Sequence, residues 1–142
     1  LLDPAHPVPQ EWLVQLVVLV RERAKTLVDM VEWVKPYFGE AVVWEEEAAT
    51  KFLTPAYAPV LRKLLDRFVS LSGFSKQAWE EQFKRLVEEE GMKMGQLAQP
   101  VRVALTGRTA SPGLFDVMEV LGRERTLSRL QQSLARAEAA HA

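Results

Sequence analysis

The side chains best suited to chemistry lie between residues 95 and 121. Arg102 and Arg108 stand on either side of Gly107, which is placed to end a helix, and the turn Ser111–Phe115 opens the next one. A guanidinium is planar, always charged and donor-only, so it can stack on an unpaired base and address its edge. A new helix start also offers unpaired backbone N–H groups. The stretch indicates a surface for single-stranded nucleic acid, and the alternative is a purely structural helix junction.

The residues of common active sites are missing or poorly placed. Cysteine is absent, and the two histidines, His6 and His141, stand near the chain ends without zinc-binding spacing. The sequence has no phosphate-binding glycine loop, and its serines have no plausible histidine partner. The carboxylate runs Glu45–Glu47 and Glu88–Glu90 are typical of solvated helix faces. We therefore expect no catalytic residue, no metal-binding residue and no enzymatic activity in this chain alone.

Length and charge are those of an ordinary globular protein. The 142 residues allow one domain or two small lobes, with 48% apolar and 26% charged residues. The net charge of −1 hides an asymmetry: residues 1–90 carry 11 Lys and Arg against 15 Asp and Glu, and residues 91–142 carry 7 against 4. A basic C-terminal third could face a polyanion. An uneven scatter of solvated charges is the alternative.

The sequence shows no signal for export or membrane insertion. Its longest apolar run, Trp12–Val20, is interrupted by Gln15 and is shorter than the roughly 20 residues of a membrane span. The N-terminus lacks a basic segment followed by an apolar core. The absence of cysteine fits a reducing compartment. We expect a cytoplasmic protein without a membrane partner. Because the sequence does not begin with methionine, we also expect a fragment of a longer chain.

Apolar spacing predicts helices along the chain after its proline-rich first nine residues. No segment alternates with period two for long enough to indicate a strand. We expect an all-α protein, a helical bundle or cage of about seven or eight short helices in two small lobes, residues 1–45 and 46–142. The expected helices cover about residues 10–21, 27–36, 44–52, 55–73, 75–91, 95–106, 112–122 and 123–139.

Single residues mark the expected helix ends. Thr26 and Ser75 are predicted N-caps, with Asp29 as the capping-box partner of Thr26. Thr54-Pro55 reads as an N-cap followed by proline at the first helical position. Pro100 interrupts a helical pattern and should kink a helix or start one. The spacing also predicts the buried side chains of the first two helices: Trp12, Leu13, Leu16, Val17, Leu19 and Val20, then Leu27, Met30, Val31 and Val34.

Three runs near the C-terminus resemble one known family. Gly91–Gly107, Ser111–Asp116 and Leu121–Arg125 are similar to the C-terminal end of bacterial glutamyl-tRNA synthetases. That family shows K-x-G-x-x-x-Q-P-x-R-x-A-L-T-G, then a [S/T]-P-G-L-F turn and L-G-x-E-R. The likeness is continuous over about 35 residues and is specific. Leu19–Leu27 resembles a helix junction of the same family, so the likeness extends over nearly the whole chain.

The resemblance implies an all-α anticodon-binding region of two helical lobes, which in the family follows a Rossmann-type catalytic domain. That catalytic domain, with its two ATP-binding signatures, is missing from this sequence. The implied parent enzyme attaches glutamate to tRNA(Glu) with ATP, and ATP and Mg would belong to its catalytic domain. No cofactor is expected in this region. The implied partners are the anticodon loop of tRNA(Glu) and the rest of the synthetase chain, and DNA is not among them.

The resemblance also assigns roles to single residues. Arg102 would form the surface that holds the first two anticodon bases, together with the loop residues Ser111, Pro112, Leu114 and Phe115. Arg23 falls where an arginine is associated with reading the third base. Cytosine offers O2 and N3 acceptors to a guanidinium, whereas the N–H groups of guanine would oppose it. The expected nucleic-acid-binding residues are Arg23, Arg102, Arg108, Ser111, Pro112, Leu114 and Phe115.

A helical protein–protein interaction or regulatory module without RNA binding is the rival hypothesis. It predicts an exposed apolar groove and no ordered basic surface. The two hypotheses differ in whether the expected binding residues face one accessible surface.

Overall fold

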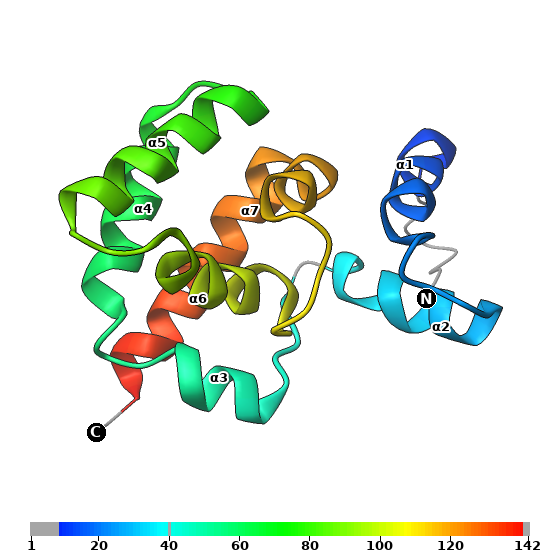
Figure 1. The fold of residues 1–142 in the computed structure, drawn as a ribbon, viewed down its shortest axis with the longest axis horizontal. Helices are drawn as coiled ribbons and strands as arrows, with labels where there is room; N and C mark the ends of the chain where they lie inside the picture. Colours follow the sequence, from blue (N-terminus) through cyan, green and yellow to red (C-terminus); the bar gives the residue numbers. More distant parts are fainter. Residues whose placement is uncertain (1–8, 40, 141–142) are drawn as a thin grey trace.

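The computed structural model describes residues 9–39 and 41–140, and in those ranges the chain forms seven α-helices, one short 3₁₀ helix and no strand (Figure 1). The all-α prediction is confirmed. The helices are α1 Gln10–Val20, α2 Leu27–Val34, η1 Lys35–Tyr37, α3 Glu46–Phe52, α4 Ala58–Ser70, α5 Lys76–Glu89, α6 Met94–Thr106 and α7 Leu114–Ala139.

Helix α7 is the centre of the larger group of helices. It packs against α4, α5 and α6, and α3 packs against α6. The side chains between these helices are fully buried, with the Trp79 ring stacked on Phe68 at 4.2 Å between centroids. Burying an apolar side chain of this size contributes on the order of 1.5–3 kcal/mol. A continuous apolar core therefore holds α3 to α7 together.

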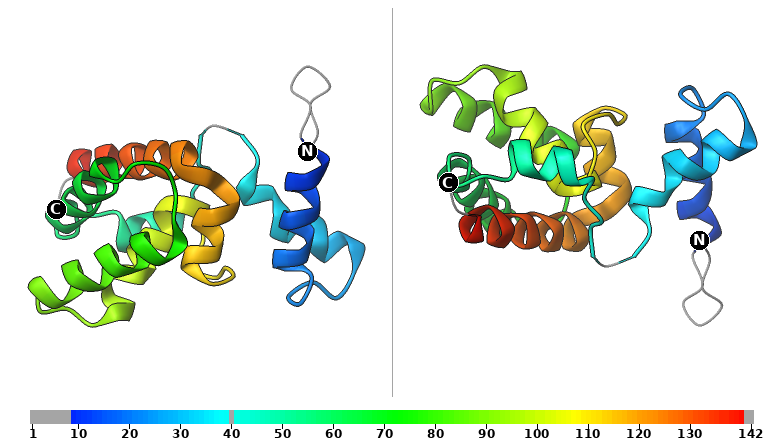
Figure 2. Two further views of the ribbon diagram at one scale, coloured as in Figure 1. Left: turned by 90° about the horizontal axis from the view of Figure 1, so that it is seen from above. Right: turned by 90° about the horizontal axis from the view of Figure 1, so that it is seen from below.

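Helices α1 and α2 form a pair at one end of the molecule, beside the start of α7 (Figures 1 and 2). Trp12 joins this pair to α7 because its indole N–H donates to the carbonyl of Val120 at 2.6 Å. The ring of Trp12 also meets Phe38 edge to face, and the guanidinium of Arg125 lies over it at 4.9 Å from the centroid. The division of the chain into lobes at residue 45 stays a prediction.

Several helix ends lie where local signals predict them. The Thr26 hydroxyl accepts a bond from the Asp29 N–H at 3.1 Å, and the Ser75 hydroxyl accepts from the Ala78 N–H at 3.3 Å. Both N-cap predictions are confirmed. Helix α7 is interrupted at Gly122, where φ is +80°, a value that glycine adopts without steric cost. The expected break between residues 112–122 and 123–139 is thus present inside one long helix.

One proline prediction needs correction, and one of the two alternatives for Pro100 is excluded. The prediction that a helix starts at Thr54-Pro55 is wrong, because α4 begins at Ala58. The N–H groups of Tyr57 and Ala58 donate to the carbonyls of Thr54 and Pro55, so a separate turn occupies this segment. Helix α6 runs through Pro100, as expected for a helix over residues 95–106, so Pro100 does not start a helix, and a kink there stays a prediction. Pro100 is itself buried in the core, which helps to hold the helix where one backbone bond is missing.

The expected burial on α1 and α2 is only partly correct. Leu16, Val20 and Val34 are buried as predicted, whereas Val17, Leu27 and Val31 are exposed. The remaining side chains of the predicted set are half-buried. The two helices pack on one another, on η1 and on the start of α7, and these contacts leave Val17, Leu27 and Val31 exposed. Apolar spacing predicts a face suited to burial, but the described chain supplies no element to cover that face.

Candidate nucleic-acid interface

Arg102 is held by the turn that follows its own helix. It lies near the end of α6, half-buried, and its Nε donates to the Ser111 hydroxyl at 2.8 Å. That hydroxyl donates in turn to the carbonyl of Pro112 at 2.8 Å. A hydroxyl can accept and donate at once, so this chain of bonds ties the plane of the guanidinium to the turn. The sequence brings these residues together locally, because only the turn at Gly107 separates them.

The turn itself is fixed by backbone groups. The Thr106 hydroxyl donates to the carbonyl of Arg102 at 2.8 Å and accepts the N–H of Arg108 at 3.1 Å. Gly107 adopts φ +78°, and its carbonyl accepts the N–H of Glu45 at 2.8 Å. Since these groups are satisfied inside the protein, the turn presents its side chains from a defined position.

Arg108 links this turn to the small helical pair. Its Nη1 donates to the backbone carbonyl of Glu32 on α2 at 2.8 Å, and its Nη2 lies 4.0 Å from the Glu32 carboxylate. The hydrogen bond and charge of Lys35 lower the pKa of Glu32, and Arg108 contributes less. The half-buried side chain of Arg108 therefore spans from the large helical group to α2.

Arg23 approaches Arg102 although the two are far apart in the sequence. Arg23 is exposed in the turn after α1, where its N–H donates to the carbonyl of Val20 at 3.0 Å. Burial lowers the pKa of Arg102, and the positive charge of Arg23 lowers it further. Arginine still remains protonated at pH 7. The charges of Arg23 and Arg102 thus act on one another, and two like positive charges favour an anionic or acceptor-rich ligand.

Tyr37 lies among these arginines and was not predicted from the sequence. Its side chain is buried, and burial raises the pKa of the Tyr37 phenol to about 12 against the opposing charges of Arg23, Arg108, Arg129 and Arg102. The phenol is therefore neutral at pH 7. No pattern in the sequence connects Tyr37 with these arginines, because its position depends on how Arg125 and Arg129 of α7 hold the carbonyls of Tyr37 and Pro36.

The residues after Ser111 do not all reach the surface. Pro112 is buried, and Leu114 is only 5% exposed. Phe115 is half-buried, with its ring edge to face with Phe83 of α5 at 5.4 Å. The structure thus joins Arg102 to Ser111 by a hydrogen bond, and the charges of Arg23, Arg102 and Arg108 all act on Tyr37. It places Pro112 and Leu114 beneath the turn, where they can support it but offer little accessible surface.

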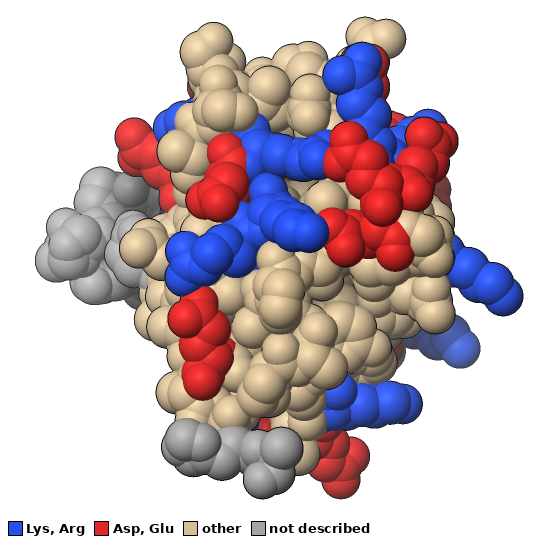
Figure 3. Space-filling model, turned by 90° about the vertical axis from the view of Figure 1, so that its left-hand side faces the viewer, with Lys and Arg blue, Asp and Glu red and all other residues tan. Residues whose placement is uncertain are grey.

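The face of the molecule formed by α4 and α5 has a different charge pattern. Figure 3 shows Lys and Arg interspersed there with Asp and Glu. Its ion pairs include Lys63–Glu90 at 2.5 Å and Arg62–Glu138 at 2.6 Å. Such pairs cancel at short range and leave little general attraction for phosphates. Arg102, by contrast, bonds to the hydroxyl of Ser111, and the shortest bond of Arg108 is to the backbone carbonyl of Glu32.

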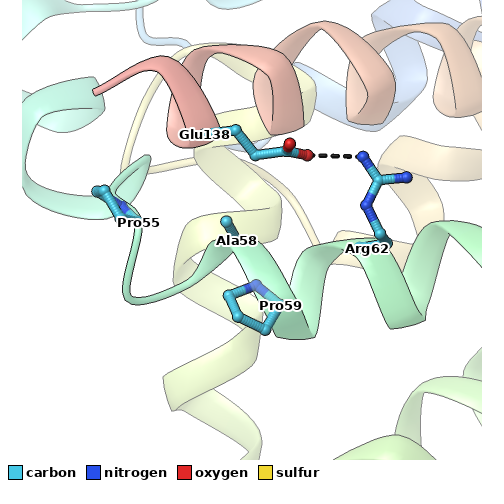
Figure 4. Close-up of a pocket in the computed structure, with 5 residues that line it drawn as sticks. All are labelled: Pro55, Ala58, Pro59, Arg62 and Glu138. Atoms are coloured by element: carbon cyan, nitrogen blue, oxygen red, sulfur yellow. Dashed lines mark hydrogen bonds and ion pairs between the residues drawn. The ribbon is translucent and has the colours of Figure 1, made fainter. Parts of the chain in front are cut away.

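One open hollow between α4 and α7 shows no reactive chemistry. It has a volume of about 420 Å³ and is lined by Pro55, Ala58, Pro59, Arg62 and Glu138 (Figure 4). Its two charged residues pair with each other. Among the described residues, no three His, Cys, Asp or Glu side chains gather as a metal site would require, and no helix is long and apolar enough to cross a membrane. Arg23, Arg102 and Arg108, which we call the arginine cluster, are therefore the candidate site.

Comparison with known proteins agrees with this choice. Residues 1–134 match the family model of the anticodon binding domain. The glutamate–tRNA ligase of Geotalea uraniireducens is 44% identical over 123 residues, which are 87% of this chain and 26% of that protein. The corresponding ligase of Thermodesulfovibrio yellowstonii is 34% identical over 131 residues, 92% of this chain and 28% of that protein. The chain thus spans about a quarter of the length of these curated relatives.

Solved structures show the same relationship. A glutamate tRNA ligase from Elizabethkingia meningosepticum in complex with its amino acid superposes with a TM-score of 0.79 at 28% identity, over 92% of this chain and 26% of that chain. The glutamate-tRNA synthetase from Elizabethkingia anophelis gives a TM-score of 0.73 at 27% identity, over 92% of this chain and 25% of that chain. These findings give no support to an interaction module without an RNA role.

Proposed function

The chain belongs to the anticodon-binding domain family, and from this premise we propose that its arginine cluster recognises the anticodon loop of tRNA(Glu). One observation carries the proposal: Ser111 orients Arg102 at the turn after α6, and the charges of Arg23, Arg102 and Arg108, which come from different parts of the chain, all act on the buried Tyr37. Anticodon bases are unpaired, so their edges can be read by guanidinium donors and their faces can stack on planar groups. The cluster supplies such donors from a scaffold held by internal hydrogen bonds.

The proposed roles follow from how each side chain is held. Arg102 is oriented by Ser111 and would address the first two bases together with the exposed part of the turn. Pro112 and Leu114 would keep the turn in shape from beneath, and Phe115 would contribute its accessible edge. Arg23 is exposed and only lightly constrained, as suits a residue that reads the third base.

The proposal includes a parent enzyme. The matched relatives are glutamate–tRNA ligases about four times as long as the matched part. We propose that the parent of this chain is a cytoplasmic ligase that joins glutamate to tRNA(Glu) with ATP. ATP and Mg would bind outside these residues. The present chain would then position the tRNA without taking part in the reaction.

Arg102→Ala in the full-length enzyme is expected to weaken tRNA(Glu) binding by about 1–3 kcal/mol, the range of one good base contact. The reason is the loss of donors that Ser111 holds in place. The dissociation constant should be measured at one fixed salt concentration, because phosphate contacts make affinity salt-dependent. Arg85→Ala is the matched control, since Arg85 pairs with Glu81 on the exposed face of α5. If both variants bind tRNA(Glu) with the affinity of the parent enzyme, the assignment of Arg102 to the site is wrong.

Arg23→Gln is expected to reduce discrimination between C and G at the third anticodon position by roughly 10-fold or more, the effect of one lost specific contact. Arginine donors suit the acceptors of cytosine and oppose the donors of guanine, whereas an amide can both donate and accept. The measurement is the ratio of kcat/KM for charging tRNA with each base. Arg21→Gln is the control because Arg21 is an exposed arginine two positions away. A parent enzyme that discriminates, together with an unchanged ratio in Arg23→Gln, would refute this assignment.

A further inference from the structure

Arg108 differs from the other two members of the arginine cluster because its guanidinium holds a backbone group of α2. Its Nη1 donates to the carbonyl of Glu32 at 2.8 Å, whereas its Nη2 lies 4.0 Å from the Glu32 carboxylate. The side chain of Arg108 is only 28% exposed. A guanidinium that is bonded to the backbone in this way suits the positioning of another element better than direct contact with a base.

The sequence of α2 explains why this carbonyl accepts a side-chain donor. Glu32 lies in the last turn of α2, and the carbonyl of a helical residue normally accepts the N–H of the residue four positions later. That residue is Pro36, which has no N–H. Arg108 supplies the missing donor, and its positive charge suits the C-terminal end of a helix.

The backbone of Arg108 is fixed in the turn after α6. The Thr106 hydroxyl accepts the N–H of Arg108 at 3.1 Å and donates to the carbonyl of Arg102 at 2.8 Å. The same turn carries Ser111, which orients the guanidinium of Arg102. Arg108 therefore connects the end of α2 with the turn that holds Arg102.

Helix α2 transmits this constraint to the turn that carries Arg23. The N–H of Asp29, in the first turn of α2, donates to the Thr26 hydroxyl at 3.1 Å. The Asp29 carboxylate accepts the N–H of Lys25 at 3.3 Å. Arg23 lies two residues before Lys25. Since α2 packs mainly against α1 and η1, the bond of Arg108 joins α2 directly to the turn after α6.

We propose that Arg108 is a positioning residue, whose bond to the Glu32 carbonyl holds α2, and with it the turn of Arg23, in a fixed place relative to Arg102. This inference rests on the proposed function, in which Arg23 reads the third base and Arg102 addresses the first two. Adjacent bases are read together only if the side chains that read them keep a fixed separation. Arg108 thus supports discrimination at the third base without contacting a base.

Arg108→Met in the full-length enzyme is expected to reduce discrimination between C and G at the third anticodon position roughly fivefold, the effect of one lost hydrogen bond. The measurement is the ratio of kcat/KM for charging the two tRNAs. Arg108→Met combined with Arg23→Gln should reduce the ratio roughly tenfold, as Arg23→Gln does alone, and not roughly fiftyfold, because Arg108 acts through Arg23. An equal loss of kcat/KM with both tRNAs, or independent effects in the double variant, would overturn the proposal.

Two further variants test the bond itself. Glu32→Gln keeps the backbone carbonyl and removes only the solvated carboxylate, so its discrimination should stay within about twofold of the parent enzyme. Arg108→Lys keeps a charged donor and should recover part of the discrimination that Arg108→Met loses. If Glu32→Gln loses as much discrimination as Arg108→Met, or if Arg108→Lys recovers none, the carbonyl bond does not hold α2 and the proposal is wrong.

Hydrogen exchange of the full-length enzyme without tRNA separates this proposal from the anticodon assignment. Arg108→Met should raise amide exchange in the peptide of residues 21–35 roughly fivefold, because α2 loses one bond that holds it. Arg85→Met is the control, since Arg85 pairs with Glu81 on the exposed face of α5. Unchanged exchange in Arg108→Met would overturn the proposal whatever Arg23→Gln does. Raised exchange with an unaltered ratio in Arg23→Gln would support the hold of Arg108 on α2 and refute the reading of the third base by Arg23.

Discussion

Arg129→Met is expected to lower the free energy of unfolding by roughly 3–5 kcal/mol, because it breaks a buried hydrogen-bond network. Arg129 is fully buried on α7. Its Nη1 donates to the carbonyls of Pro36 and Leu105, and its Nη2 donates to those of Phe38 and Gly39. A buried acceptor left without a donor costs about 1–3 kcal/mol, and methionine fills part of the space without replacing any bond.

Urea unfolding followed by circular dichroism measures this effect. Arg62→Met is the matched control, because Arg62 is a surface residue whose pair with Glu138 is solvated and contributes little. Arg129→Lys should recover only part of the loss, since one ammonium cannot reproduce the planar fork. A loss below about 1 kcal/mol in Arg129→Met would mean that water replaces the guanidinium.

The same substitution should also affect the candidate site. Arg129 holds residues 36–39, and Tyr37 lies in this segment with its carbonyl bonded to Arg125 at 2.7 Å. Without these bonds, the η1 helix, which contains Tyr37, would no longer be held against α7. We therefore expect weaker tRNA binding by the folded fraction of the Arg129→Met enzyme.

Gly107→Ala is expected to destabilise the protein by roughly 3–5 kcal/mol, from backbone strain together with steric overlap. A Cβ at this position would lie 2.0 Å from the carbonyl oxygen of Val43 and 2.9 Å from the Cα of Trp44. These are backbone atoms, so no side-chain rotation can relieve the contact. The positive φ of Gly107 adds the cost of a left-handed conformation.

Gly73→Ala separates the two contributions. Gly73 has φ +72°, close to the +78° of Gly107, but a Cβ there would meet nothing within 4 Å. It should cost about 1–2 kcal/mol, the strain of the conformation alone. The midpoints of thermal and urea unfolding of both variants give the difference. If the two variants lose the same stability, the contact of Gly107 with residues 43–44 is easily relaxed and the steric argument fails.

Helix ends were predicted well where one or two residues determine them. Thr26 and Ser75 cap their helices with their own hydroxyls, and Gly122 interrupts α7 through its own φ value. These are local effects and need no tertiary contact. The start of α4 was predicted less well, because Pro55 can stand equally in a turn or in a first helical turn.

Burial was harder to predict than helix formation. The spacing of Val17 and Leu27 correctly indicates amphipathic helices, but both side chains are exposed. Whether an apolar face is buried depends on whether another element lies against it, and the spacing of one helix does not contain that information. A sequence pattern describes one side of an interface only.

The sequence by itself determined the all-α fold, the caps at Thr26 and Ser75 and the interruption at Gly122, since each depends on apolar spacing or on residues within one turn of one another. Only the tertiary structure decided that the charges of Arg23 and Arg102 act on Tyr37, and that Arg129 holds the segment carrying Tyr37. Those contacts join residues far apart in the sequence. They form because Trp12, Arg125 and Arg129 hold α1 and the 36–39 segment against α7, and no local preference specifies that packing.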